Sequence, residues 1–304
     1  MIEVSKLTRR YGDTTAVRDL SFTVRPGHVT GFLGPNGAGK TTTLRMLLGL
    51  IEPTSGTATV SGHSFRRHPR GLHHVGALLD AGDVHGGRSA RAHLHALARS
   101  NGIPTRRVDE VLTEVGLTGA AARRRIGGYS LGMKQRLGIA TALLGDPPVL
   151  LFDEPLNGLD PEGVLWVRQL FRRLAAEGRT VFVSSHLMSE MEHTADELVV
   201  IGRGELIAAE SLDEFAARGT QPTVTVRTPD AGALAALLSA EGAAVVPYDT
   251  ETLKVAGVDS VRIGEIAHEH RFLLWELAAQ AASLEAAFME LTADSVEYLA
   301  GESR

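Results

Sequence analysis

Hydrophobic and polar residues alternate at the start of the chain. Ile2–Leu7 follows a period of two and Ala16–Arg25 follows it less regularly, which predicts two β-strands. Three other segments, Val29–Leu33, Val149–Phe152 and Thr180–Ser185, are largely apolar without alternation. Short apolar runs of this kind are typical of strands that are buried on both faces of a parallel sheet. The pattern therefore predicts an α/β fold.

A helical period dominates between these apolar runs. Residues Thr41–Gly49 predict a helix after the glycine-rich loop that follows Val29–Leu33. Short strands are expected at Gly56–Gly62 and His73–Leu79. Three more helices are expected at Ala90–Asn101, Arg107–Val115 and Leu131–Leu144. This block predicts a helical subdomain over about residues 84–145, inserted ahead of the second buried strand.

The composition changes at Gly219–Pro222, which predicts two domains, residues 1–219 and residues 220–304. Beyond this point the pattern predicts strand, helix, strand, strand, helix and strand, and then a last helix over Ser283–Ala300. The first six elements are expected at Thr223–Thr228, Asp230–Glu241, Ala243–Pro247, Thr252–Val255, Val258–His268 and Phe272–Leu277. This order is that of the ferredoxin-like unit, so a small accessory α+β domain is expected. Dimer contacts, regulation and partner docking are all open as its role.

The loop between the first buried strand and the helix that follows it is rich in glycine. The loop fits G-x-x-x-x-G-K-[ST] at every fixed position. Glycine lets backbone N–H groups turn inward, and the helix presents its positive end, so the loop is expected to bind phosphate groups. In this pattern Lys40 contacts the β- and γ-phosphates and the Thr41 hydroxyl binds Mg²⁺. The predicted nucleotide-binding residues are Gly34, Pro35, Asn36, Gly37, Ala38, Gly39, Lys40, Thr41 and Thr42.

Two acids follow the second buried strand directly. Asp153 and Glu154 are expected at the carboxyl end of the sheet, where open α/β sheets place their ligands. Asp153 suits Mg²⁺, through water or directly, and Glu154 is placed to orient or deprotonate an attacking water. His186 follows the third buried strand, where it either contacts a phosphate or that water, or caps the next helix. Glu154, His186 and Lys40 are the predicted catalytic residues.

The segment Tyr129-Ser-Leu-Gly-Met-Lys-Gln-Arg136 resembles the signature sequence of ABC transporter ATP-binding subunits, which is usually Leu-Ser-Gly-Gly-Gln. The phosphate loop, this signature, the acidic strand end, Asn157–Asp160 and His186 occur in that family's order over about residues 1–215. The chain is similar to subunits of the drug, antibiotic or bacteriocin-immunity export type. The resemblance implies a P-loop NTPase-type domain with a RecA-like core, an antiparallel β subdomain and the helical subdomain.

Ser130 and Gly132 begin a predicted helix and form a second anion-binding end in the same chain. One chain with two such ends suggests that one binds its own ATP and the other a partner's. The family packs two copies head to tail around two ATPs, which implies a dimer of this chain. The resemblance also places Asp160 in the loop between the two sites. It gives Tyr11 the role of stacking on adenine, although a turn tyrosine can equally pack on the sheet.

Two features depart from the family's usual pattern. Asp80 occupies the place where the family usually has a Gln that contacts Mg²⁺ and the attacking water. An acid there is expected to tighten metal binding or to alter coupling to the partner, and a similar acid occurs in subunits for antibiotic resistance and bacteriocin immunity. Leu131 and Met133 replace a glycine and a glutamine of the signature. Because the anion-binding residues remain, ATP binding is still expected.

The composition limits the partners. The 304 residues include no cysteine, carry a formal net charge of −5 and contain neither a signal peptide nor a long apolar span. Nucleic acid is therefore not expected as a partner, and work at a membrane must pass through another protein. Without cysteine, pairs such as His93/His95 and His268/His270 do not predict a protein-ligated transition metal.

The sequence thus predicts an ATPase that requires ATP and Mg²⁺, dimerises on ATP and drives a separately encoded multi-span permease. By resemblance the transported compound is a drug, a peptide antibiotic or a lipid-like molecule, moved outward. The expected location is cytoplasmic, on the inner face of the membrane through the permease. Two alternatives stay open, a soluble ABC-type ATPase that acts on ribosomes or DNA and a weakly active permease regulator.

Overall fold

The computed structural model describes residues 1–218, 223–280 and 284–292. They form two compact units, one with Met1–Leu212 and the described residues after Glu290, the other with Asp213–Glu290. Each unit has its own hydrophobic core. The boundary predicted at residues 219–220 lies outside the described residues and stays a prediction.

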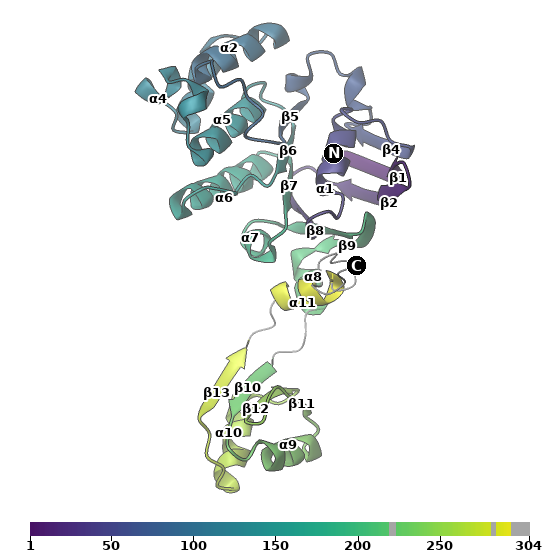
Figure 1. Ribbon diagram of the computed structural model, residues 1–304, viewed down its shortest axis with the longest axis vertical. Helices are drawn as coiled ribbons and strands as arrows, with labels where there is room; N and C mark the ends of the chain where they lie inside the picture. Colours follow the sequence, from purple (N-terminus) through teal and green to yellow (C-terminus); the bar gives the residue numbers. More distant parts are fainter. Residues whose placement is uncertain (219–222, 281–283, 293–304) are drawn as a thin grey trace, which may run out of the picture. The chain divides into compact units, whose positions relative to one another are not determined.

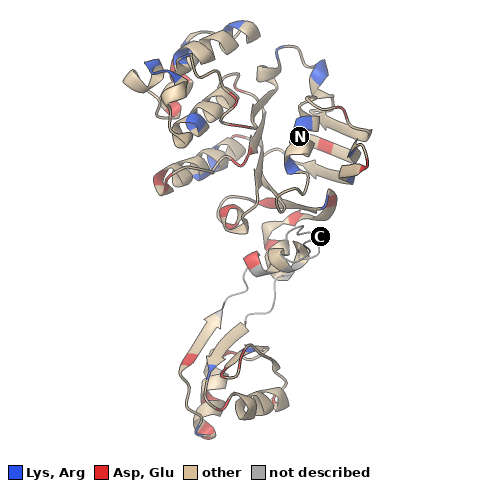
Figure 2. Ribbon diagram, viewed as in Figure 1, with Lys and Arg blue, Asp and Glu red and all other residues tan. Residues whose placement is uncertain are grey.

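A six-stranded sheet forms the centre of the first unit (Figure 1). Its order is β5-β6-β7-β3-β8-β9, and neighbouring strands are parallel except for β9, which is antiparallel to β8. The strands are β3 (Val29–Leu33), β5 (Val75–Leu78), β6 (Val149–Asp153), β7 (Thr180–Ser185), β8 (Glu197–Gly202) and β9 (Glu205–Ser211). Every residue of β3, β6 and β7 is buried, which explains why their sequences are largely apolar. In Figure 2 these strands contain no charged residue before Asp153, the acid that ends β6.

A smaller antiparallel sheet of order β2-β1-β4 packs beside the central sheet. It consists of β1 (Ile2–Tyr11), β2 (Thr14–Val24) and β4 (Ser55–Val60). Phe22 of this sheet lies 5.7 Å, between ring centroids, from both Phe32 and Phe182 of the central strands, and those two rings lie 5.0 Å apart. The three rings therefore join the two sheets in one core.

Helices cover both faces of the central sheet. Helix α1 (Lys40–Leu47) lies on the side of the antiparallel sheet, whereas α2, α4, α5 and α6 lie on the other side (Figure 1). The helical subdomain contains α2 (Ala90–Asn101), α3 (Arg106–Glu114), α4 (Gly119–Arg123) and α5 (Leu131–Leu143). Helix α6 (Pro161–Ala176) comes after β6 in the chain, and α7 (Met188–Glu192) comes after β7.

Several predicted elements have different ends. The strand expected at His73–Leu79 begins only at Val75, because a turn of 3₁₀ helix occupies Gly71–His73. The strand expected at Gly56–Gly62 ends at Val60, because the next two residues turn the chain with φ of +49° and +78°. The second strand begins at Thr14, which pairs with Tyr11, so Tyr11 belongs to β1 and not to the turn.

Within the second unit, a four-stranded antiparallel sheet of order β11-β12-β10-β13 packs with helices α9 and α10. Helix α8 (Leu212–Arg218) precedes this sheet in the chain. Its elements are β10 (Thr223–Arg227), α9 (Ala231–Ala240), β11 (Ala244–Pro247), β12 (Thr252–Ala256), α10 (Ser260–Glu269) and β13 (Glu276–Gln280). This is the strand order of the ferredoxin-like unit. The last strand was expected at Phe272–Leu277, but the pairing with β10 starts only at Glu276. Of the helix expected at Ser283–Ala300, the structure describes α11 (Leu284–Thr292), and the remaining residues lie outside the described part.

Candidate active site

Three strands of the central sheet end side by side and bring the predicted residues together. Strand β3 pairs in parallel with β7, with Leu33 opposite Ser185, and β7 pairs with β6, with Ser184 opposite Asp153. The segments that follow these strands carry the phosphate loop, Glu154 and His186. Parallel pairing therefore places residues that are far apart in sequence at one edge of the sheet.

The phosphate loop encloses a cavity of about 260 Å³, and two of its glycines leave no room for a side chain. A Cβ at Gly39, where φ is +101°, would lie 2.6 Å from the carbonyl oxygen of Ala16, and a Cβ at Gly34 would lie 2.5 Å from that of Ile201. The cavity is lined by Ala16, Pro35, Asn36, Gly37, Ala38, Gly39, Lys40, Thr41, Thr42 and Glu154. Its glycine-rich backbone and the start of α1 suit an anionic ligand.

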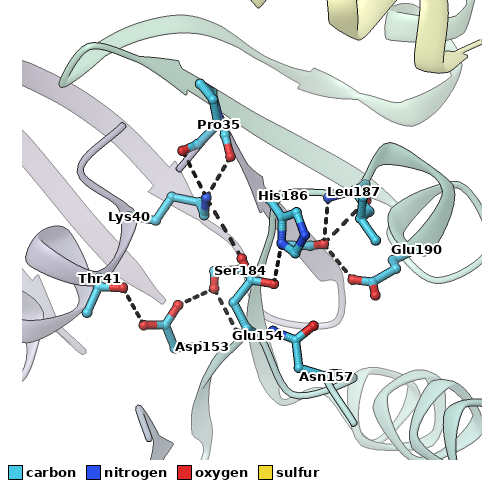
Figure 3. A network of polar contacts seen from close by, with 12 residues as sticks. Pro35, Lys40, Thr41, Asp153, Glu154, Asn157, Ser184, His186, Leu187 and Glu190 are labelled. Atoms are coloured by element: carbon cyan, nitrogen blue, oxygen red, sulfur yellow. Dashed lines mark hydrogen bonds and ion pairs between the residues drawn. The ribbon is translucent and has the colours of Figure 1, made fainter. Parts of the chain in front are cut away.

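Lys40 lines this cavity, and polar contacts hold its ammonium group in place (Figure 3). Its side chain is 7% exposed, and Nζ donates hydrogen bonds to the carbonyl oxygens of Gly34 at 2.6 Å and Pro35 at 3.2 Å. Nζ also lies 3.9 Å from Oε1 of Glu154. Burial lowers the pKa of Lys40, and the Glu154 and Asp153 carboxylates partly oppose this shift. A phosphate in the cavity would supply the charge that this buried ammonium needs.

Thr41 and Asp153 converge from opposite sides of the site. The Thr41 hydroxyl donates to Oδ2 of Asp153 at 2.7 Å, and the Ser184 hydroxyl donates to Oδ1 of the same carboxylate. A hydroxyl and a carboxylate oxygen beside a phosphate cavity are the donors that Mg²⁺ prefers. The residues present therefore fit Mg²⁺, held by Thr41 and Asp153, with Ser184 fixing the carboxylate.

Glu154 stands between the two other predicted catalytic residues. Its Oε2 lies 2.9 Å from Nδ1 of His186, while its other oxygen faces Lys40 (Figure 3). An ionised carboxylate only accepts, so Nδ1 carries the hydrogen of this contact. Burial raises the pKa of Glu154, and the hydrogen bond and charge of His186 and then the charge of Lys40 oppose that shift. A half-buried carboxylate with a raised pKa and two orienting partners is suited to accept a proton.

The signature residue Ser130 and the loop residue Asp160 cap two helices that begin away from this cavity. The Ser130 hydroxyl caps α5 by accepting the N–H of Met133 at 3.2 Å, and the Asp160 carboxylate caps α6 by accepting the N–H of Gly163 at 2.8 Å. Helix α5 lies across the central sheet from α1 (Figure 1). Over the described residues, no hydrogen bond or ion pair joins Ser130, Gly132 or Asp160 to the phosphate loop. One chain thus places its two predicted phosphate-binding ends apart.

Tyr11 and Asp80 are not brought into the cavity. Tyr11 is 45% exposed, and the Arg9 guanidinium lies over its ring at 4.4 Å. Asp80 is exposed, and its Oδ1 accepts the N–H of Gly82 at 2.6 Å. No hydrogen bond or ion pair links Asp80 to Thr41 or Asp153 in the described part of the chain.

Sequence reasoning missed two side chains that support the acidic strand end. Ser184 accepts the Glu154 N–H at 3.0 Å besides donating to Asp153, and Gln135 donates to the carbonyl oxygen of Glu154. Ser184 is a polar residue inside a buried strand, a signal that could have singled it out. Gln135 carried no such signal, because the burial of its side chain depends on how α5 packs.

Comparison with known proteins decides the family. A family model described as "ABC transporter" matches residues 17–157. An uncharacterized ABC transporter ATP-binding protein of Bacillus subtilis (strain 168), YhcH, is 35% identical over 98% of this chain and 97% of its own length. The chain belongs to the ABC transporter ATP-binding proteins.

Other relatives of this ABC protein carry names that state what they transport. The bacitracin transport ATP-binding protein BcrA of Bacillus licheniformis is 42% identical over 72% of each chain.

A solved structure of an ATP-binding subunit of an ABC transporter has a TM-score of 0.66 at 27% identity, and the match covers 72% of this chain and 92% of the chain in that structure. A second family model, described as a domain of unknown function, matches residues 222–285.

As an ABC ATP-binding subunit, the protein uses ATP with Mg²⁺ and hydrolyses ATP in the service of transport. Cassettes of this family dimerise and pair with a transmembrane permease. Among the residues that the structure describes, no helix is both long and apolar enough to cross a membrane.

Proposed function

We propose that two copies of this chain pack head to tail, so that the phosphate loop of one copy and the signature residues of the other enclose each ATP. The separation of the two anion-binding ends supports this arrangement. The N-terminus of α5 lies away from the chain's own phosphate cavity. A nucleotide phosphate that binds there therefore belongs to the ATP held by the phosphate loop of a second copy. In this arrangement Asp160 lies between the two sites, and the exposed ring of Tyr11 stacks on adenine.

Within each site, Glu154 is the general base. Its carboxylate, oriented by His186, accepts a proton from the attacking water, and Lys40 stabilises negative charge on the transferred phosphoryl group. Thr41 and Asp153 would hold Mg²⁺, which would neutralise charge on the phosphates. The observation that carries this proposal is the Lys40–Glu154–His186 arrangement, in which Lys40 and Glu154 line the phosphate cavity and His186 contacts Glu154. We extend it to Asp80, which is expected to act near the metal when the dimer closes.

The transported compound follows from the relatives. Proteins named for transport of bacitracin, and a lantibiotic transport ATP-binding protein of Streptococcus pyogenes named SrtF that is 35% identical over 70% of this chain, favour export of a peptide antibiotic or a similar drug. The same names favour transport over action on ribosomes or DNA. The subunit then works as a peripheral protein on the inner face of the cell membrane, bound to a separately encoded permease.

A cap-preserving substitution tests the head-to-tail dimer. Ser130→Asp keeps an N-cap acceptor on α5 but sets a negative charge against the partner's ATP, so ATP-dependent dimerisation should be lost. Ser89→Asp makes the same change at the N-cap of α2 and should dimerise as wild type does. Size-exclusion chromatography with light scattering, with and without ATP and Mg²⁺, measures both.

Mixing two inactive variants gives the sharper result. Lys40→Met destroys the phosphate loop of one copy and Ser130→Asp the signature of the other. A head-to-tail heterodimer then contains one intact site and one doubly defective site. ATP-dependent pull-down of one tagged variant by the other, with ATP turnover above either variant alone, is expected. Failure of the mixture to associate on ATP would contradict the arrangement.

A further inference from the structure

The backbone at Glu154 is held in an unusual conformation. Its φ is +49°, a value that few residues other than glycine adopt and that must be stabilised by the surroundings. Two side chains hold the peptide groups on either side. The Ser184 hydroxyl accepts the Glu154 N–H at 3.0 Å, and the Gln135 amide nitrogen donates to its carbonyl oxygen at 3.4 Å. The direction of the Glu154 carboxylate therefore depends on both contacts.

Gln135 is placed for this donor role. Its side chain is 6% exposed, and the same Nε2 donates to the carbonyl oxygen of Asn157 at 3.3 Å. Its amide oxygen is buried with no hydrogen-bond partner among the described atoms. The opposite orientation of the amide would set that oxygen against two carbonyl oxygens, so the donor side is fixed. Leaving this oxygen unpaired costs free energy. The two hydrogen bonds that Nε2 donates to the turn after β6 offset this cost.

The start of α5 packs on this same turn. A Cβ at Gly132 would lie 3.2 Å from the carbonyl oxygen of Gly158, and a Cβ at Gly158 would lie 2.2 Å from Leu131 Cδ2. Leu131, Gly132 and Gln135 therefore contact the segment from Glu154 to Gly158 along the first turns of one helix. The N-cap of that helix is Ser130, about 7.5 Å along the axis from Gln135.

We infer that Gln135 is a positioning residue for the general base, and that α5 links the two ATP sites through it. A helix moves as a rigid element, so a phosphate bound at Ser130 in the partner's site shifts or steadies Gln135, and with it the Glu154 of the chain's own site. Nucleotide at one site thereby affects hydrolysis at the other. This inference rests on the proposed head-to-tail dimer and adds to it the side chain that carries the coupling.

The test compares two substitutions of Gln135 with a control on the same helix. Gln135→Met keeps the length and volume but removes the donor, whereas Gln135→Glu offers a donor only when its carboxyl is protonated. Thr141→Val removes a hydroxyl whose hydrogen bond, among the residues that the structure describes, goes to the carbonyl oxygen of Leu137 within α5, and it should leave turnover unchanged. The full-length chain is assayed for kcat, affinity for a fluorescent ATP analogue, and the Hill coefficient for ATP.

Gln135→Met is expected to lower kcat about 10- to 100-fold, because a misplaced base costs rate, with nucleotide affinity within about twofold of wild type. The Hill coefficient should fall towards about 1 as the sites lose their coupling. For Gln135→Glu, kcat relative to wild type should fall as the pH rises, because the ionised carboxyl repels the carbonyl oxygens. The same ratio for Gln135→Met should not change with pH.

The outcomes separate the two ideas. If the wild-type chain stays monomeric when ATP is added, the proposed dimer and the coupling between sites are both wrong. The positioning role is then tested by kcat and by the pH dependence of kcat relative to wild type. A wild type that dimerises with a Hill coefficient above 1, while Gln135→Met keeps that coefficient, would overturn the coupling. A Gln135→Met variant with wild-type kcat, or a pH ratio that is flat for both variants, would overturn the positioning role.

Discussion

Glu154→Gln tests the assignment of the general base with the smallest available change. The amide has the size of the carboxylate, and its oxygen can still accept a hydrogen from Nδ1 of His186, 2.9 Å from the present carboxylate oxygen. The backbone contacts that hold φ at +49° do not involve the side chain. The substitution therefore removes the proton acceptor and leaves the framework.

The expected loss of kcat is about 10²- to 10⁴-fold, which is the usual contribution of a positioned base and corresponds to about 2.7–5.4 kcal/mol in the barrier. ATP affinity should stay the same or rise. Glu154 Oε1 lies 3.9 Å from the Lys40 ammonium, where it competes with the phosphates for the same positive charge. ATP with Mg²⁺ should therefore hold the variant in the dimeric state for longer than it holds the wild type.

Turnover at saturating ATP and Mg²⁺, binding of a fluorescent ATP analogue and size-exclusion chromatography measure these quantities. Glu190→Gln is the matched control, because this carboxylate accepts the Ser185 hydroxyl at 2.5 Å and influences Glu154 only through its charge. Its turnover should stay within about threefold of wild type. Wild-type turnover in Glu154→Gln would falsify the base assignment, and loss of ATP binding would show that the carboxylate supports the site and not the chemistry.

Three further predictions concern the titration of Glu154 and the fit of the phosphate loop. Because burial raises the pKa of Glu154, kcat should rise with pH as this carboxyl ionises, above the ordinary glutamate range. A raised pKa favours the fold while the group is protonated and loses that contribution as the pH rises, so Glu154→Gln should gain stability relative to wild type in urea unfolding as the pH rises above the ordinary glutamate pKa. Gly39→Ala should lower the free energy of unfolding by about 1–3 kcal/mol and abolish ATP binding, because its Cβ would clash with the carbonyl oxygen of Ala16. Gly27→Ala is the control, because Gly27 also has a positive φ but open space around it, and this variant should keep ATP binding. Thermal unfolding with and without ATP checks that pair, and equal behaviour of the two variants would contradict the clash.

The buried strands and the phosphate loop were predictable because their signals are local. A run such as Val149–Asp153 needs no partner to be read as buried, and Gly34–Thr41 carries its pattern in eight consecutive residues. Elements with weaker periodicity were placed less well. The last strand of the second unit begins at Glu276 because its register with β10 decides it, and Phe272, which sequence reasoning put in that strand, packs on the core before the strand starts.

The supporting side chains could not be predicted in the same way. Ser184 and Gln135 act through backbone groups of Glu154 that lie 30 and 19 positions away in the chain. A polar residue inside a buried strand marks Ser184, but the sequence does not name the partner of either side chain. The positions of Asp80 and Tyr11 relative to ATP and metal stay predictions, because both depend on ligands and on a second copy.

By itself, the sequence determined the family and the nucleotide and predicted the residues that bind it, because each motif is a short pattern whose chemistry follows from its residue types. Only the tertiary structure decided how those motifs meet. Parallel pairing of β3, β7 and β6 brings Lys40 and His186 to opposite sides of the Glu154 carboxylate, and the packing of α5 brings Gln135 to the Glu154 carbonyl oxygen. These contacts join segments that are distant in the chain, and a sequence pattern records the segments but not the distances between them.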